Sequence, residues 1–133
     1  MKLTTKSEYL LLALIYMARH DGDEFVRIED ICIEYRIPKK YLEQLFQLLK
    51  QNRVILTRRG TGGGYKLARP AAQISIAEIF RLTDGALAPT ESVSKYFYAH
   101  TPLEKEEKII AVLKDIRDYV AEKLEALSLA DIL

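Results

Sequence analysis

The chain has 133 residues, of which 49% are hydrophobic and 29% charged, and its formal net charge is +1. This composition is that of an ordinary soluble globular protein, and the length suits one domain with a substantial core. The single Cys32 excludes an intrachain disulfide. Residues 10–18 are apolar but too short to cross a bilayer, and they do not suit a signal peptide because an acidic residue precedes them and no small-residue cleavage site follows. We therefore expect a cytoplasmic protein without a membrane partner.

The charges are unevenly distributed along the chain. Residues 36–69 contain nine basic residues and one acid, Glu43, so this segment carries a charge of +8. The other segments are mildly acidic, at −3 for residues 1–35, −1 for 70–103 and −3 for 104–133. A basic block confined to one segment is typical of a face that binds duplex DNA.

The N-terminal segment predicts a helix from about residue 5 to residue 19 or 20. Thr4 or Thr5 is its expected N-cap, with Glu8 completing a capping box after Thr5. The helix is apolar nearly all round over residues 9–18, so we expect burial on more than one side. A turn at residues 21–24 follows, and residues 25–26 form either a short strand or a connection directed to the core.

Two short helices separated by a proline come next. Ile28, Ile31, Cys32 and Tyr35 have helical spacing, and the chain breaks at residues 36–38 because a residue before proline is steered out of the helical region. The second helix begins near Pro38. Its buried stripe is expected to consist of Leu42, Leu45, Phe46 and Leu49. Its outward residues are expected to be Lys39, Lys40, Glu43, Gln44, Gln47 and Lys50.

A hairpin with a glycine-rich loop follows the second helix. Residues 54–57 and 65–67 are the expected strands, with Arg58 and Arg59 at the mouth of the loop and Gly60 and Gly62 among its turn formers. Helix, turn, helix and hairpin in this order indicate a winged helix-turn-helix. The competing interpretation, a nucleotide phosphate loop, is disfavoured because the glycines lead into a strand and no Gly-Lys-Ser/Thr follows.

The C-terminal third predicts one short and one long helix. Ser75 and Glu78 form an expected capping box for a helix that runs through Thr83 and ends at residues 84–85, whereas residues 86–100 lack periodicity. Thr101 and Glu104 predict a second box, with Pro102 at the first helical position. That helix continues to about residue 127 along the apolar stripe Ile109, Leu113, Ile116, Val120, Leu124 and Leu127. A last helical turn is expected at residues 128–131.

A stripe of about six turns exceeds what a small winged-helix core needs, so it implies a partner helix; the alternative is packing on its own domain alone.

Four segments carry a family resemblance: MKLTTKSEY, YLEQLFQLLKQNRVI, RRGTGGGYKLARP and ISIAEIFRLTDG. Together they resemble the Rrf family of bacterial winged-helix transcription regulators, the family of IscR, NsrR and CymR. The resemblance covers most of residues 1–85 and continues more loosely through the long C-terminal helix. It implies that the first residues, Thr4 and Lys6, lie near the DNA backbone, that Arg59 and Gly60 match the wing tip, and that the long helix pairs in a homodimer.

Cluster-binding members of this family carry three cysteines in the segment that corresponds to residues 86–100. This chain has none there, so we expect no iron-sulfur cluster and no cofactor. Cys32, His20 and His100 lack a metal-site spacing, and Cys32 is expected to be a buried structural thiol in preference to a redox sensor. The aromatic residues 96–98 are expected to pack, with an effector pocket as the alternative.

The expected fold is mainly α with a small β-hairpin. It comprises a winged helix-turn-helix domain at residues 1–85, a connecting loop and candidate effector region at 86–100, and a dimerisation helix with a C-terminal turn at 101–133. The expected function is a homodimeric DNA-binding repressor, with a winged-helix protein-interaction module as the alternative. The sequence shows no paired-carboxylate motif and no nucleophile-base motif that would suggest an enzyme.

The residues expected at DNA divide by role. Phosphates would be neutralised by Lys6, Lys39, Lys40 and Arg58, and bases read by Glu43 and Gln44, with Tyr41 nearby for a backbone or thymine-methyl contact. The operator, the effector and the regulated genes are not predictable from the sequence. The full set of expected DNA-binding residues is Thr4, Lys6, Lys39, Lys40, Tyr41, Glu43, Gln44, Arg58, Arg59, Gly60 and Gly62, and that of the dimer interface is Ile109, Leu113, Ile116, Val120 and Leu124.

Overall fold

The computed structural model describes residues 1–22 and 24–133; the turn expected at residues 21–24 includes Asp23, which lies outside the described residues. The fold is mainly helical with one two-stranded antiparallel sheet, as the sequence predicts. Its principal elements are α1 (Thr5–Arg19), α2 (Ile28–Tyr35), α3 (Lys39–Gln51), β1 (Ile55–Arg58), β2 (Gly64–Leu67), α4 (Ile76–Asp84) and α5 (Glu107–Ala126).

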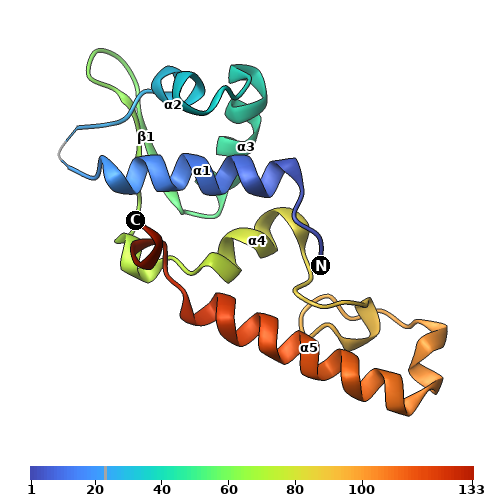
Figure 1. Ribbon diagram of the computed structural model, residues 1–133. Coiled ribbons are helices and arrows are strands. Elements are labelled where there is room, and N and C mark those ends of the chain that lie inside the picture. The colour runs from blue at the N-terminus through green and yellow to red at the C-terminus, as the bar shows by residue number, and fades with distance from the viewer. Residues whose placement is uncertain (23) are drawn as a thin grey trace.

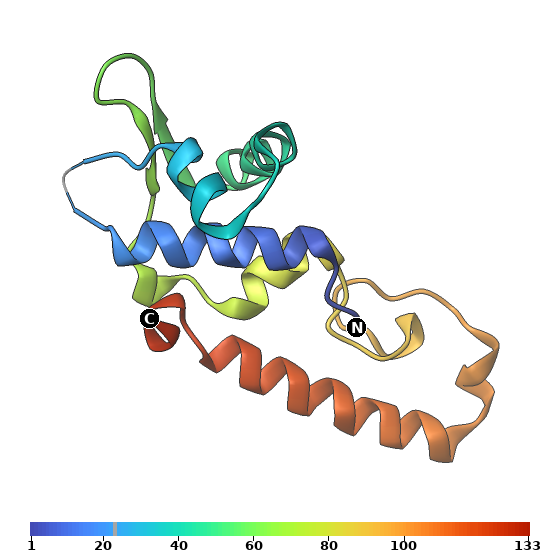
Figure 2. The ribbon, with the colours of Figure 1, turned by 45° about the horizontal axis from the view of Figure 1, so that its top comes forward.

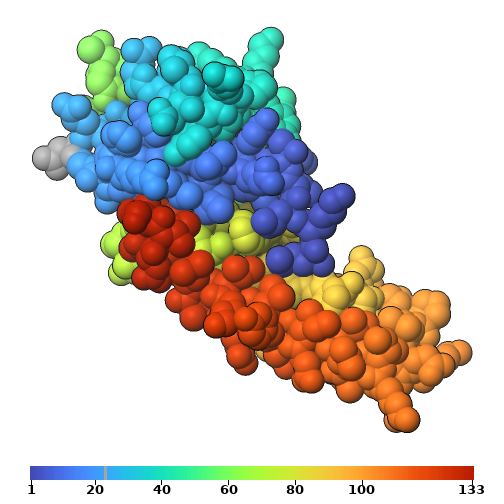
Figure 3. Space-filling view, in the orientation of Figure 1, coloured from blue at the N-terminus to red at the C-terminus, as the bar shows by residue number. Residues whose placement is uncertain are grey.

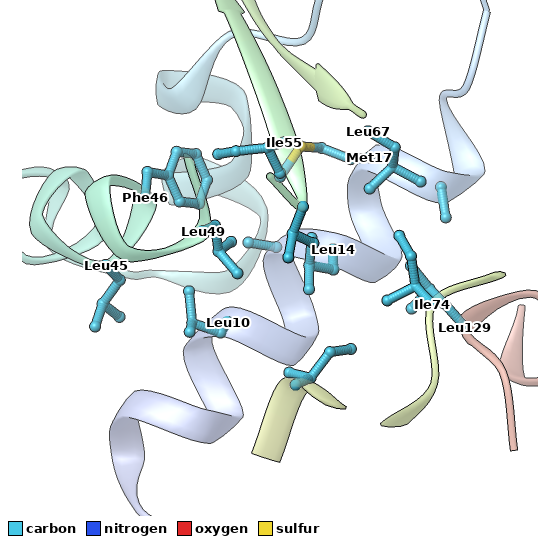
Figure 4. Packing of buried hydrophobic residues seen from close by; sticks show 14 of the residues in the cluster. Leu10, Leu14, Met17, Leu45, Phe46, Leu49, Ile55, Leu67, Ile74 and Leu129 are labelled. Atoms are coloured by element: carbon cyan, nitrogen blue, oxygen red, sulfur yellow. The ribbon is translucent and has the colours of Figure 1, made fainter. Parts of the chain in front are cut away.

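Helix α1 lies at the centre of the molecule. Figures 1 and 2 show α2, α3 and the hairpin on one side of it, and α4 and α5 on the other. The same order of layers is visible in the space-filling view of Figure 3. Leu10, Leu14 and Met17 of α1 are almost completely buried and meet residues from both sides (Figure 4). The apolar character of α1 all round its axis therefore serves two packing faces, as predicted.

Of the two N-caps expected for α1, Thr4 and Thr5, the structure has Thr4. Thr4 is the N-cap, and its side chain accepts a hydrogen bond from the Ser7 backbone N–H at 3.4 Å, so the capping box from Thr5 to Glu8 is wrong. Asp84 at the end of α4 accepts further hydrogen bonds from the Thr4 hydroxyl at 2.5 Å and from the Ser7 hydroxyl at 2.5 Å. A carboxylate at the positive end of α1 is favourable, and it ties α4 to α1.

The helix-turn-helix agrees closely with its sequence pattern. Helix α2 ends at Tyr35, and Arg36 adopts a left-handed conformation with φ of 55°. Pro38 is the N-cap of α3, because its backbone is extended while the next residue is helical. The predicted break at residues 36–38 is confirmed, and the Ile37 side chain between the helices is buried in the core.

The hairpin pairs Ile55 with Leu67 and Arg58 with Gly64. Val26 forms an additional antiparallel bridge to Tyr65, with hydrogen bonds of 2.8 and 2.7 Å in the two directions. The sequence left residues 25–26 open between strand and connection, and the structure shows a single-residue bridge. It brings the Val26 carbonyl so close that a Cβ on Gly64 would lie 2.3 Å from its oxygen.

Helix α4 begins and ends as predicted, with one difference at its cap. The Ser75 hydroxyl accepts from the Glu78 N–H at 3.1 Å, and Gly85 follows the helix with φ of 73°. Glu78 does not complete the predicted capping box, since its carboxylate instead forms an ion pair with Arg69. This pair joins α4 to the segment that leaves the hairpin.

Helix α5 begins later than the sequence predicts. Residues 102–105 form a 3-10 turn, and the α-helix starts at Glu107. The predicted capping box is absent, and both of its side chains have other partners. The Thr101 hydroxyl donates to Ser92 at 2.8 Å, and the Glu104 carboxylate accepts from the Tyr98 hydroxyl and lies 2.7 Å from His100 Nδ1.

The C-terminal turn returns to the core. Ser128 and Asp131 form a capping box at a 3-10 turn, which confirms the last turn predicted there. Leu129 is fully buried, and its N–H donates to the Ile74 carbonyl at 2.8 Å. The C-terminal end of α5 is thereby fixed to the same core as α1, while its other end extends away from it (Figures 1 and 2). No helix in the described part of the chain is long and apolar enough to span a membrane.

Candidate nucleic-acid interface

Helix α3 has one buried face and one exposed face. The four predicted core residues Leu42, Leu45, Phe46 and Leu49 are all buried, which confirms the stripe. Lys40, Glu43 and Gln44 are exposed on the opposite side. Because α3 is amphipathic, its polar face points away from α1 and is available to a ligand.

Two aromatic contacts fix the orientation of α3. Phe46 packs edge to face against Tyr65 of the hairpin, with ring centroids 4.7 Å apart. Tyr41 packs in the same manner against Tyr9 of α1, at 5.6 Å. Such pairs contribute beyond the burial of their area and restrain the helix from both sides. Tyr41 is half-buried by this contact, so only part of its ring is available for the DNA contact expected from the sequence.

The hairpin carries its basic residues at the open end. Arg58 closes β1, and Arg59, Gly60 and Gly62 follow in an exposed loop. Gly60 and Gly62 have φ of 86° and 74°, which glycine adopts without steric cost. The Arg58 guanidinium lies 5.8 Å from the ring centre of Phe25. The loop and α3 lie on the same side of α1 (Figures 1 and 2), as a winged helix-turn-helix requires.

The basic block is less uniform than its sequence suggests. Lys39 Nζ lies 3.0 Å from Glu29 Oε1 and 3.9 Å from Glu43 Oε1, and Arg69 pairs with Glu78. The hydrogen bond from Lys39 holds the pKa of the Glu29 carboxyl below its usual range, and the same bond raises the pKa of the Lys39 ammonium. Within residues 1–22 and 24–133, the remaining seven basic residues of the block have no carboxylate at ion-pair distance: Arg36, Lys40, Lys50, Arg53, Arg58, Arg59 and Lys66.

The N-terminal residues expected near DNA have different surroundings. Lys6 is exposed in the first turn of α1. The Thr4 hydroxyl is already engaged, because it donates to Asp84 and accepts from the Ser7 backbone. A DNA phosphate would therefore have to compete with Asp84 at Thr4, whereas Lys6 is accessible.

Cys32 is half-buried and packs against the core, close to Glu29. Burial raises the pKa of its thiol, and the charge of Glu29 adds to the shift. A reactive cysteine needs a lowered pKa, so these surroundings favour the structural thiol. In the described residues, no group of three His, Cys, Asp or Glu side chains lies close enough to hold a metal ion.

The aromatic residues of the connecting loop are more exposed than packing would predict. Tyr96, Phe97 and Tyr98 are 70%, 46% and 53% exposed. The Arg81 guanidinium lies over the Tyr96 ring, 4.9 Å from the ring centre, and the Tyr98 hydroxyl donates a hydrogen bond to Glu104. The hollow between this loop, Arg81 and Arg117 has a volume of about 10 Å³, enough for about one water molecule.

Helix α5 presents two different apolar faces. Val120, Leu124 and Leu127 pack against the protein's own core. A second stripe, with helical spacing, is exposed by 42% to 64%: Ile109, Val112, Ile116 and Tyr119. Of the five residues predicted at a dimer interface, Ile109 and Ile116 thus lie on the exposed stripe, Leu113 is half-buried, and Val120 and Leu124 face the core. Sequence reasoning missed Val112 and Tyr119, although Val112 follows Ile109 by three residues and Tyr119 follows Ile116 by three.

Glu29 was also missed in the sequence. It lies ten residues before Lys39 and in another helix, so no helical periodicity links the two side chains. Only the crossing of α2 and α3 brings the two side chains together.

Comparisons with known proteins agree with this architecture. A model of the Rrf2 family, described as iron-dependent transcriptional regulators, matches residues 3–133. The regulator IscR of Cereibacter sphaeroides is 41% identical over 86 residues, which are 63% of this chain and 56% of that protein. IscR of Xenorhabdus nematophila is 37% identical over 95 residues, 71% of this chain and 58% of that protein. The chain thus spans little more than half the length of these curated relatives.

The solved structures include close neighbours over the whole chain. CymR of B. subtilis, described as the global cysteine regulator of that organism, superposes with a TM-score of 0.80 and 27% identity over 99% of this chain and 95% of its own. IscR of T. potens gives a TM-score of 0.77 with 26% identity, over 99% and 85% of the two chains. The match to the family model, the relatives and the shared winged-helix architecture show that the chain belongs to the Rrf2 family of transcriptional regulators.

Proposed function

We propose that this protein is a cytoplasmic, homodimeric repressor that binds duplex DNA through α3 and the wing, which is the hairpin of β1 and β2 with its loop. Helix α3 would enter the major groove with Glu43 and Gln44 toward the bases, and the loop that contains Arg59 and Gly60 would enter the adjacent minor groove. Lys6, Lys40 and Arg58 would neutralise phosphates and so position the protein without reading sequence.

One observation carries this proposal. Lys39 is paired with Glu29, but among the described residues the other basic side chains of α3 and its neighbouring hairpin loop, Lys40, Lys50, Arg58 and Arg59, have no acidic partner. The two elements lie on the same side of α1 (Figure 1). A surface in which acids and bases alternate would neutralise itself. An uncompensated basic surface instead favours a polyanion, because binding releases the counterions condensed on the duplex.

The homodimer is supported by the exposed stripe of α5. Four large apolar side chains follow one another along about ten residues of a helix whose other face already packs on the core. Soluble proteins seldom leave such a continuous stripe in water, and a second copy of the helix would cover it. The predicted partner contacts therefore centre on Ile109 and Ile116, with Val112 and Tyr119 added.

We further propose that the protein acts without an iron-sulfur cluster, although the family is described as iron-dependent. Protein-bound clusters are held mainly by cysteine thiolates, and this chain has one cysteine, which packs in the helix-turn-helix. The purified protein should be colourless, and iron chelators should leave its DNA affinity unchanged. A brown protein that contains iron and sulfide in similar amounts would contradict this proposal.

DNA binding is tested most directly by its salt dependence. If Lys6, Lys40, Arg58 and Arg59 of each protomer neutralise one phosphate, the plot of log K against log salt should have a slope of about −7. Fluorescence anisotropy with a labelled random duplex at several salt concentrations measures this slope. A winged-helix module that binds only proteins, the alternative function, would show no salt-dependent binding of duplex.

A further inference from the structure

Glu29 lies between two basic residues at the proposed DNA-binding surface. Its carboxylate is 3.0 Å from Lys39 Nζ at the start of α3 and 3.7 Å from Arg27 Nε. Arg27 lines a hollow together with the wing residues 60–63. One acid of α2 therefore reaches both the first residue of the recognition helix and a cation beside the wing.

Glu29 is a closer partner of Lys39 than Glu43, the acid nearest to Lys39 along α3. Glu43 stands in the (i, i+4) position to Lys39, but its oxygen is 3.9 Å away, against 3.0 Å for Glu29. The pKa of Lys39 is raised mainly by its hydrogen bond to Glu29. The ammonium that begins α3 is thus already paired with a carboxylate before any DNA approaches.

We propose that Glu29 is an internal competitor for the DNA phosphate that Lys39 would otherwise neutralise, and that it thereby limits the affinity of the protein for any duplex. This inference rests on the proposed DNA binding. It assigns to Glu29 a role opposite to that of the basic residues around it.

The exposure of the pair permits this exchange. The side chains of Lys39 and Glu29 are 51% and 41% exposed, so a phosphate can reach the ammonium without any movement of the backbone. Ion pairs in such surroundings are weak, because water and salt screen them. A duplex, with one charge per ~1.7 Å of its axis, can therefore displace one carboxylate, but the free energy of the lost pair reduces the affinity.

Glu29→Gln tests the competition with little change of shape. The substitution should raise affinity for a random duplex by about 1.5- to 5-fold per protomer, the range expected for one exposed ion pair. It should also steepen the salt slope, by at most about 0.9 per protomer, because in the unmodified protein Lys39 neutralises a phosphate only in those complexes in which its pair with Glu29 is broken. The matched control is Glu34→Gln, since Glu34 is exposed on the same helix and has no basic partner at ion-pair distance among the described residues.

A double-mutant cycle separates the competition from a general change of charge. In a Lys39→Met background, Glu29→Gln should lose most of its effect on affinity and slope, and any remainder beyond that of Glu34→Gln is the release of Arg27, which lies 3.7 Å from Glu29. The measurements use the full chain, a random duplex and several salt concentrations.

Three outcomes overturn the role of Glu29. These are an equal effect of Glu29→Gln and Glu34→Gln, an unchanged effect of Glu29→Gln when Lys39 is Met, or a loss of affinity in Glu29→Gln, which would mean that Glu29 orients Lys39 for binding. In all three, salt-dependent binding by the unmodified protein would leave the proposed function intact. A protein that binds no duplex at low salt would remove both the proposed function and this inference.

Discussion

The surface formed by α3 and the wing and the exposed face of α5 differ in chemical character, and so they suit different kinds of partner. The first is polar and combines basic side chains with glycines that give the hairpin loop its positive φ angles. The second is a stripe of large apolar side chains on a single helix, with exposed fractions of 42% to 64%. A charged surface suits a ligand that is bound and released under control of salt, whereas an apolar stripe suits a permanent partner.

The two surfaces also differ in how they are connected to the core. Helix α3 is restrained along its length by Phe46 and Tyr41, which pack on the hairpin and on α1. Helix α5 is fixed at its C-terminal end by Leu129 and extends from the body at the other. A partner helix would therefore add packing to α5, whereas α3 already packs on two other elements of its own chain.

The largest effect is expected from a charge in the exposed stripe of α5. Ile116→Asp should dissociate the dimer, because the carboxylate would be buried without a partner. DNA affinity should then fall by about 10²- to 10⁴-fold, the factor that linking two binding modules contributes. Sedimentation and anisotropy measure the two effects, and Ala111→Asp, on an exposed part of α5 outside the stripe, is the control. An unmodified protein that sediments as a monomer would contradict the interface.

The next effect concerns the wing. Gly64→Ala should reduce the free energy of unfolding by about 3 kcal/mol, because Gly64 has φ of 146° and its Cβ would overlap the Val26 carbonyl. Gly62→Ala is the matched variant, with positive φ but no atom within 4 Å of the added Cβ, and should cost only about 1 kcal/mol. Urea unfolding measures both. Equal losses would show that the bridge between Val26 and Tyr65 does not restrain the wing.

Glu43 should act on sequence discrimination more than on general affinity. Glu43→Ala should weaken binding to the operator by about 1–3 kcal/mol, the cost of one lost base contact, and leave or raise affinity for random duplex. The competing explanation is a structural pair with Lys39, which is weakened by the distance of 3.9 Å and by the closer Glu29. Titration against operator and scrambled duplex decides between them, since equal tightening on both would remove the reading role.

The smallest effect compares two adjacent lysines. Lys40→Ala should reduce the magnitude of the salt slope by about 0.9 per protomer, because Lys40 is free to neutralise a phosphate. Lys39→Ala should change it less, since Glu29 already occupies the Lys39 ammonium. Identical changes for the two variants would show that the ion pair seen in the structure does not persist in solution.

Local patterns determined most of the fold. Each helix expected from apolar spacing is present, and the breaks at Pro38 and Gly85 lie where the backbone preferences of these residues place them. The start of α5 was wrong by about five residues. The side chains of Thr101 and Glu104 hydrogen-bond to Ser92, Tyr98 and His100 and not to the backbone N–H groups that a capping box would use. A capping pattern in sequence describes what two side chains can do, and other partners decide whether they do it.

The sequence by itself determined that this chain forms a winged helix-turn-helix with a basic segment and a long amphipathic helix. These features depend on residues close together in the chain, whose spacing sets which side chains share a face. Only the tertiary structure decided which basic residues are free and which face of α5 is exposed. Lys39 meets Glu29 because α2 crosses α3, and Val120 meets the core because Leu129 anchors the end of α5. Both depend on contacts between separate elements, which no periodicity along the chain records.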